Sequence, residues 1–196
     1  IKPTVPHNVS NALAAAGLAR TIGIPHEKIR EAITSFTPGK HRIEEVLEKD
    51  SITWINDSKA TNPHAAAASI MSALSVVWIA GGLAKGATMG ELVERVKARV
   101  RVAILIGEDR ELIARELKDR APHIEIISVD TPAQYERGGT DNSFMEKVVT
   151  QAREKALAGD TVLLAPACAS MDQFVSYADR GDRFTQAVKK VINNEK

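Results

Sequence analysis

The chain has 196 residues, which is enough for one sizeable domain plus an appendage and too short for three domains. Its 26 Lys and Arg nearly balance its 25 Asp and Glu, so no global field recruits nucleic acid or a membrane surface. Hydrophobic residues make up 44% of the sequence, as in an ordinary globular core, and no apolar run approaches membrane-spanning length. A single cysteine excludes an intramolecular disulfide framework and is compatible with a reducing cytoplasm, where we expect the protein to reside.

The first part of the chain predicts two helices. Apolar residues recur at helical spacing in 8–22, where Gly23 follows as a stop, and again in 25–36. Pro38 and Gly39 then punctuate the segment Thr37–Lys40, which we interpret as a linker. We therefore expect a helical appendage, residues 1–37, ahead of a separate domain, residues 38–196.

After this linker, short β-branched runs alternate with helical patterns. Strands are expected at 43–47 and 52–55, where the polar residues between them predict a hairpin, and then at 76–80, 102–106, 124–129 and 161–165. Helices are expected at 63–74, 91–98, 110–120, 142–158 and 184–193. This alternation predicts an α/β fold, a mainly parallel Rossmann-like sheet with helices on both faces.

The segment Asn56–Pro63 connects a predicted strand to a predicted helix, and it carries an acid, a cation, two hydroxyls and two amides. In open α/β sheets, ligands bind in such loops at the carboxyl ends of strands, and a helix N-terminus favours anions. A phosphorylated or carboxylated ligand would suit this chemistry. The alternative is that Asn62 or Thr61 only caps the helix, with Pro63 at its first position.

Four stretches together resemble the Mur ligase family, in the family's order and over nearly the whole chain. They are His7–Asn11, Asn56–Asn62, Gly81–Gly86 and Ala165–Ser170 with the following Asp179–Gly181. The amino-acid sequence of Asn56–Asn62 is most similar to the corresponding motif of the members that add D-glutamate. The resemblance covers only the later part of such an enzyme, because members also have a domain for the uridine nucleotide and a central ATPase domain opened by a phosphate loop.

The phosphate-loop motif Gly-x-x-x-x-Gly-Lys-Ser/Thr does not occur in this sequence. The resemblance therefore implies a C-terminal fragment, in which residues 1–37 are the helical end of the central ATPase domain and residues 38–196 form the C-terminal amino-acid-binding domain. We expect this fragment to be monomeric and inactive alone. The alternative is a stand-alone, non-catalytic module that binds a nucleotide or an amino acid.

The resemblance implies an ATP-dependent ligase of peptidoglycan synthesis. In that reaction the γ-phosphoryl group of ATP passes to the carboxylate of UDP-N-acetylmuramoyl-L-alanine, and the amine of D-glutamate attacks the resulting acyl phosphate. Such chemistry depends mostly on positioning and charge stabilisation. The implied cofactors are ATP and Mg²⁺, with the Mg²⁺ ligands expected in the absent central domain.

The resemblance assigns ATP contacts to Asn8 and Asn11 at the adenine edge, Arg42 at phosphate and Asp57 at the ribose hydroxyls. It makes Lys59 the catalytic cation that neutralises phosphate charge near the reacting carboxylate. An amide can donate and accept in one plane, as adenine requires, and a guanidinium fork suits phosphate. The alternatives are that Ser10 or Asn8 only caps the first helix, that Arg42 is a surface cation, and that Asp57 and Lys59 form a local ion pair.

The D-glutamate pocket is implied to come from three loops. Thr61, Lys85 and Ser170 would hold the two substrate carboxylates, with backbone contacts from Met171 and Tyr177. Gly81 and Gly82 would let the chain turn sharply and expose the Lys85 ammonium at the sheet edge. The alternatives are a solvated loop lysine for Lys85 and a helix cap for Ser170.

Other residues are expected to have structural roles. Cys168 lies between two alanines and is predicted to be a small buried hydrophobe rather than a nucleophile. Trp54 and Trp78 fall in strand runs and are expected to pack in the core. Val5 stands where family members often have Gly, which bears on how closely the backbone can approach a nucleotide.

Overall fold

A computed structural model describes residues 4–193, and the chain divides into two compact units with the boundary between Lys40 and His41. The first unit contains α1 (Pro6–Thr21) and α2 (His26–Ser35), as the sequence predicts. Helix α1 begins after Val5, which makes no side-chain cap, and has Pro6 in its first turn. The suggestion that Asn8 caps this helix is therefore wrong.

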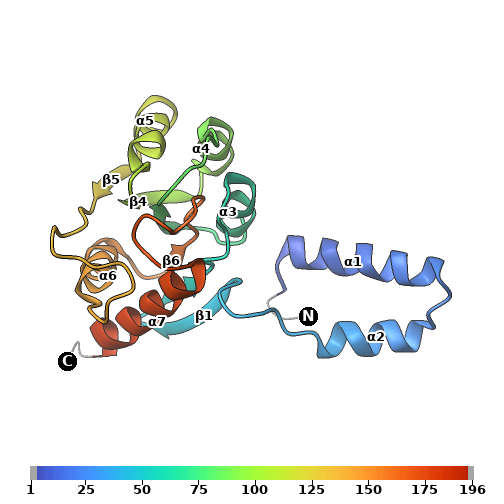
Figure 1. Ribbon diagram of the computed structural model, residues 1–196. Coiled ribbons are helices and arrows are strands. Elements are labelled where there is room, and N and C mark those ends of the chain that lie inside the picture. Colours follow the sequence, from blue (N-terminus) through green and yellow to red (C-terminus); the bar gives the residue numbers. More distant parts are fainter. Residues whose placement is uncertain (1–3, 194–196) are drawn as a thin grey trace. The chain divides into compact units, whose positions relative to one another are not determined.

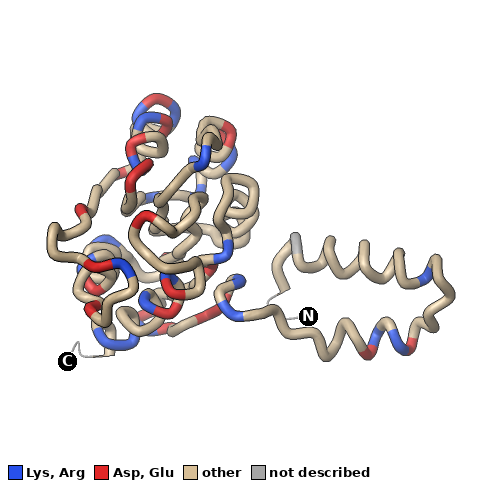
Figure 2. The backbone as a smooth tube through the Cα atoms, in the orientation of Figure 1, with Lys and Arg blue, Asp and Glu red and all other residues tan. Residues whose placement is uncertain are grey.

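Helix α1 is unusually poor in charge. Arg20 is its only Lys, Arg, Asp or Glu residue, so α1 is almost entirely tan in Figure 2. Large apolar side chains of this unit are exposed, with 69% of Leu13, 71% of Leu18 and 78% of Ile22 accessible to solvent. A helix that is apolar on several sides is typical of one covered by further protein.

The second unit is built on one six-stranded sheet. Its strands are β1 (Glu44–Lys49), β2 (Ile52–Asn56), β3 (Val76–Gly81), β4 (Val100–Ile106), β5 (Glu125–Ser128) and β6 (Thr161–Leu164), in the spatial order β1-β2-β6-β3-β4-β5. Strand β1 pairs antiparallel with β2, and all other pairs are parallel. The predicted hairpin is confirmed: Asp50 and Ser51 form a two-residue turn in which both residues have positive φ, as a type I′ turn requires.

Helices cover both faces of this sheet (Figure 1). One face carries α3 (Pro63–Ile70), α4 (Gly90–Val96) and α5 (Arg110–Arg120), and the other carries α6 (Ser143–Lys155) and α7 (Tyr177–Asn193). Each face buries a separate apolar cluster, with Trp78 in the first and Trp54 in the second, both fully buried. The predicted fold class and the packing role of both tryptophans are confirmed.

The order of the strands leaves a place for a ligand at the carboxyl edge of the sheet. Strand β6, the last in sequence, lies between β2 and β3. The chain leaves β2 for α3 on one face, whereas it leaves β6 for α7 on the other face. Adjacent strands whose connections part in this way define a topological switch point, which is where open α/β sheets bind ligands.

The last helix begins earlier than predicted. The sequence predicts a start near Phe184, but α7 begins at Tyr177, so Arg180 and Gly181 lie in its first turns. A Cβ atom on Gly181 would come 2.3 Å from Nδ1 of His41, so the glycine allows α7 to pack closely against this ring. Ser170 does not cap α7, because six residues in turns and bends separate them.

None of the helices in residues 4–193 is both long and apolar enough to cross a membrane.

Candidate functional site

The loop after β2 is anchored by a buried amide. Asn56 is fully buried, and its Nδ2 donates to Gly181 O at 3.0 Å and to Thr185 Oγ1 at 3.1 Å, and lies 3.0 Å from His41 Nδ1. Its Oδ1 accepts a hydrogen bond from Ser58 N at 3.1 Å. Asn56 therefore joins the β2 loop to α7 and has a structural role.

The next residues bring an acid and a cation to the carboxyl edge. The Asp57 side chain is nearly buried, and its Oδ1 accepts a hydrogen bond from Ile43 N at 3.3 Å. Lys59 donates its backbone N–H to His41 O at 3.1 Å and holds its Nζ 3.8 Å from the centroid of the Tyr177 ring. This cation–π contact fixes where the ammonium lies.

The helix that follows is capped by one of the two candidates. Asn62 Oδ1 accepts a hydrogen bond from Ala65 N at 2.9 Å, and Pro63 occupies the first helical position. Capping is therefore the role of Asn62 in this structure. Thr61 is half-buried and directly precedes the cap.

The loop after β3 depends on two glycines. Gly81 and Gly82 have φ of 116° and 128°, and a Cβ on them would lie 1.9 Å from Ile106 O and 2.1 Å from Ala169 O, respectively. No other residue type could occupy these positions without moving the backbone. Leu83 and Ala169 exchange two backbone hydrogen bonds of 2.9 Å, so the loop after β3 pairs with the loop after β6.

Lys85 is held in a strained backbone conformation in this loop. Its φ is +50°, in the left-handed region, and its side chain is exposed. The loop is fixed just before it, because Ala84 N donates to Asp109 Oδ2 at 2.8 Å. A left-handed non-glycine residue costs roughly 1–2 kcal/mol, and such strain is concentrated at functional sites.

The loop after β6 is fastened to its neighbours. Ala167 N donates to Ala60 O at 2.9 Å, which ties this loop to the one after β2. Ser170 is buried, and its carbonyl oxygen accepts from Phe174 N at 2.8 Å. Met171 is 52% exposed, and its carbonyl oxygen accepts from Arg137 Nη1 at 2.5 Å. The structure thus brings the loops that carry Thr61, Lys85 and Ser170 together at one edge of the sheet.

A fully buried arginine lies beneath these loops. Arg180 donates from Nε to Ser58 Oγ at 2.9 Å and from Nη2 to the carbonyl oxygens of Ser58 at 3.0 Å and Cys168 at 3.2 Å. Burial lowers the pKa of its guanidinium to about 10, which still leaves it charged at neutral pH. The sequence alone assigned Ser58 and Arg180 no role in the site. The signal for both was that they lie in stretches that carry the family resemblance, Asn56–Asn62 and Asp179–Gly181.

Cys168 is buried, as predicted. Burial raises the pKa of its thiol to about 12, so the thiolate that a nucleophile requires is scarce at neutral pH.

The three remaining residues of the predicted ATP site are divided between the two units. Asn8 and Asn11 are on α1 in the first unit, three residues apart on one helix face. Arg42 is exposed at the start of the second unit, between His41 and Ile43, which have φ of 62° and 48°. Their nucleotide contacts stay predictions.

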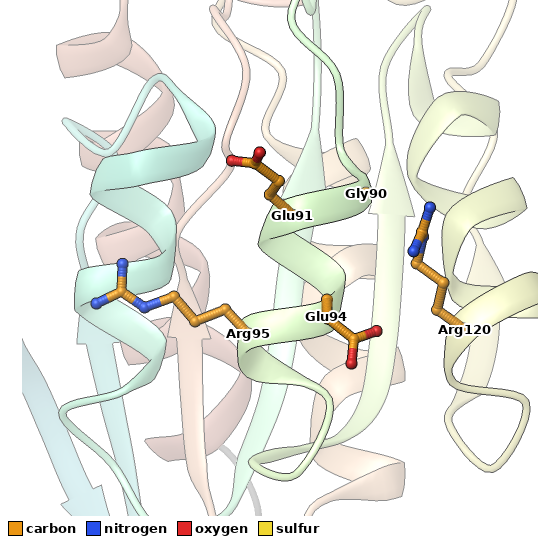
Figure 3. Close-up of a pocket in the computed structure, with 5 residues that line it drawn as sticks. All are labelled: Gly90, Glu91, Glu94, Arg95 and Arg120. Atoms are coloured by element: carbon orange, nitrogen blue, oxygen red, sulfur yellow. The ribbon is translucent and has the colours of Figure 1, made fainter.

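A separate surface hollow of about 320 Å³ is lined by Gly90, Glu91, Glu94, Arg95 and Arg120, all from helices α4 and α5 (Figure 3). Two of its charged groups are paired at the surface, Arg120 with Glu116 and Glu94 with Lys97. Because no residue of the three loops contributes to it, we do not assign it to the candidate site. Among the described residues, no three His, Cys, Asp or Glu side chains are grouped as a metal site.

Residues 41–168 match the family model described as Mur ligase, glutamate ligase domain, and the chain belongs to the Mur ligase family. The chain is 50% identical over 189 residues to the UDP-N-acetylmuramoylalanine--D-glutamate ligase of Streptomyces avermitilis, covering 96% of this chain and 39% of the relative. The ligase of the same name from Mycobacterium tuberculosis (strain CDC 1551 / Oshkosh) is 47% identical over 208 residues, covering 95% of this chain and 42% of the relative.

Solved structures support the fold alone. The UDP-N-acetylmuramate-alanine ligase of Thermotoga maritima superposes with a TM-score of 0.61 at 18% identity, covering 97% of this chain and 39% of that one. A pseudomurein peptide ligase of Methanothermus fervidus gives a TM-score of 0.62 at 16% identity, covering 97% and 37%. The chain therefore spans about two fifths of the length of its relatives.

Proposed function

We propose that this chain is the amino-acid-binding part of an ATP-dependent ligase that joins D-glutamate to UDP-N-acetylmuramoyl-L-alanine in peptidoglycan synthesis. The supporting comparison is that several relatives 45–50% identical to it carry the D-glutamate ligase name. The supporting observation is the convergence of three loops at the switch point. We further propose that the protein acts in the cytoplasm as a monomer.

The D-glutamate carboxylates would be held by side chains from these three loops. Thr61 contributes a hydroxyl from the loop after β2, Lys85 an ammonium from the loop after β3, and Ser170 a hydroxyl from the loop after β6. The backbone bonds between Leu83 and Ala169 fix the second and third of these loops against each other. A cation and two hydroxyls in such a place suit a dicarboxylate.

Backbone groups would complete the pocket. The carbonyl oxygens of Met171 and Tyr177 already accept hydrogen bonds from Arg137 Nη1 and Ser58 Oγ. Their N–H groups are therefore the better candidates for substrate contacts. Tyr177 is the first residue of α7, and the N–H groups of a helix N-terminus favour a carboxylate.

In the proposed reaction, the substrate carboxylate attacks the γ-phosphorus of ATP, which forms an acyl phosphate and releases ADP. The amine of D-glutamate then attacks the acyl carbon, loses a proton and displaces phosphate to leave the amide. Lys59 would stabilise the negative charge that develops on the transferred phosphoryl group.

The nucleotide contacts are proposed for each residue separately. Asp57 would accept hydrogen bonds from the ribose hydroxyls, Arg42 would pair with phosphate, and Asn8 and Asn11 would read the adenine edge. We place the Mg²⁺ ligands in the central domain of the full protein.

We assign the first unit to the end of that central domain. Its support is the exposure of Leu13, Leu18, Ile22 and Phe36 on a unit whose first helix carries one charge. A larger protein body would cover these side chains and give the two helices the burial that makes helices stable.

The proposal is tested with the full-length protein that contains this sequence, supplied with ATP, UDP-N-acetylmuramoyl-L-alanine and one amino acid at a time. D-Glutamate should give the amide with equal amounts of ADP and phosphate, whereas L-glutamate and L-lysine should not. Preference for L-lysine would overturn the substrate assignment. Saturable D-glutamate or nucleotide binding without turnover would favour the non-catalytic module.

A further inference from the structure

Arg180 has an environment that disfavours a charge. It is fully buried, and burial of a guanidinium carries a large desolvation penalty. Among residues 4–193, no carboxylate lies within ion-pair distance of it. Arg180 is also the fourth residue of α7, where the helix dipole repels a cation. The hydrogen bonds of Arg180, together with attraction to the more distant Asp172 carboxylate, therefore compensate for burial and for the helix dipole.

The bonds that Arg180 makes all end on two loops of the candidate site. Nε and Nη2 both reach Ser58, through its hydroxyl and carbonyl oxygens, and Nη2 also reaches Cys168 O. Ser58 lies between Asp57 and Lys59, and Cys168 lies two residues before Ser170. One planar guanidinium thus spans the loop after β2 and the loop after β6.

Ser58 extends this connection to a third segment. Its hydroxyl accepts from Arg180 Nε and donates to Tyr177 O at 2.7 Å, and the Tyr177 ring carries the Lys59 ammonium. The path from Arg180 to Lys59 therefore runs through one hydroxyl and one aromatic ring. A small shift of Ser58 would move Lys59 relative to Ser170.

From these contacts we infer that Arg180 and Ser58 are positioning residues that clamp the two loops together and so set the distance between Lys59 and Ser170. The inference rests on the proposed function for its catalytic consequence, but the clamp itself is a property of this chain. A lysine at position 180 would keep the charge, yet its single ammonium could not bridge a hydroxyl and two carbonyl oxygens in the fixed geometry of a guanidinium.

The clamp is tested on this chain through its single cysteine, because a thiol reagent can reach the buried Cys168 only when the loop opens. Arg180→Met should increase the rate of Cys168 labelling in native buffer about 10- to 100-fold, since each lost bond is to a charged group. Arg180→Lys should label nearly as fast. Ser58→Ala, which removes only the hydroxyl and is the safer variant for folding, should label about 3- to 10-fold faster.

Arg101→Met is the matched control. Arg101 is tied to Asp160 and Lys155 O at the opposite edge of the sheet, so its loss should lower global stability without opening the loop of Cys168. Global unfolding is followed by circular dichroism in urea for every variant. Labelling that rises only in step with global unfolding in Arg180→Met and Ser58→Ala, as in the control, would overturn the clamp. Wild-type labelling in Arg180→Lys would show that charge, not bridging, is what matters.

The catalytic consequence is measured separately in the full-length protein. Arg180→Lys should lower kcat for ligation by about 10-fold or more, whereas the KM for ATP and the activity of Arg101→Met stay near wild type. An unchanged kcat would refute the positioning role even if labelling shows the clamp. Absence of ligation in the wild type would instead contradict the proposed function, and the labelling result would still decide whether the clamp exists.

Discussion

Replacing Lys85 by Met in the full-length protein should weaken D-glutamate binding selectively. The change keeps the length of the side chain and the left-handed backbone of the loop, but removes the ammonium. A hydrogen bond to a charged group contributes roughly 1.5–3 kcal/mol, which corresponds to about 10- to 150-fold weaker binding of D-glutamate. The affinity for ATP should barely change. The KM or Kd of each substrate, measured while the others saturate, gives both values.

Two controls separate a lost contact from a damaged fold. Lys118→Met changes an exposed lysine on α5 and should leave both affinities unchanged. Lys85→Gly also removes the ammonium, but it relieves the left-handed strain of about 1–2 kcal/mol, so it should weaken D-glutamate binding without lowering stability. Equal losses for ATP and D-glutamate in Lys85→Met, with the fold intact by circular dichroism, would refute the assignment and leave Lys85 as a solvated loop residue.

Other predictions follow from the same structure. Asp57→Ala should have the opposite effect to Lys85→Met, weakening ATP more than D-glutamate, and equal Kd changes would contradict a ribose contact. Limited proteolysis should first cut within Thr37–Lys40, as mass spectrometry of early fragments can show; first cuts inside the sheet domain would place the boundary elsewhere. This chain alone should show no ATP hydrolysis or amide formation above background. For Asp160, burial raises the pKa but bonds from Arg101, Ser75 and Leu157 N outweigh it, so its folded pKa is lowered. Its stabilisation is therefore present above the unfolded pKa of about 3.9 and is lost as pH falls through the lower folded value. Urea unfolding from pH 6 to pH 2.5 should show this loss in the wild type and less of it in Asp160→Asn, and identical slopes would refute it.

Much of the fold could be predicted because its elements are locally encoded. The apolar run that ends at Asn56 and the Pro63 that follows it mark a strand, a loop and a helix, and the structure has β2 and α3 there. The helix 110–120 was predicted at both ends. The start of α7 near Phe184 was wrong, since the helix begins at Tyr177 and includes Gly181, whose missing side chain accommodates the His41 ring from a segment 140 residues away in sequence.

The sequence predicted only those residues of the candidate site that lie within a recognisable motif. Thr61, Lys85 and Ser170 stand in loops between recognisable elements, so the sequence could place them at one sheet edge. The bonds between Arg180 and Ser58 link positions 122 residues apart, and no local pattern encodes such a contact. Likewise, the sequence does not reveal that the Met171 carbonyl is held by Arg137 from the loop after β5.

The central claim is that the loops after β2, β3 and β6 bind D-glutamate, and a crystal structure of the full-length protein with D-glutamate or the ligated product tests it most directly. We predict glutamate carboxylate oxygens within about 3 Å of Lys85 Nζ and of the hydroxyls of Thr61 and Ser170. Glutamate bound away from these three loops, with Lys85 pointing into solvent, would contradict the account.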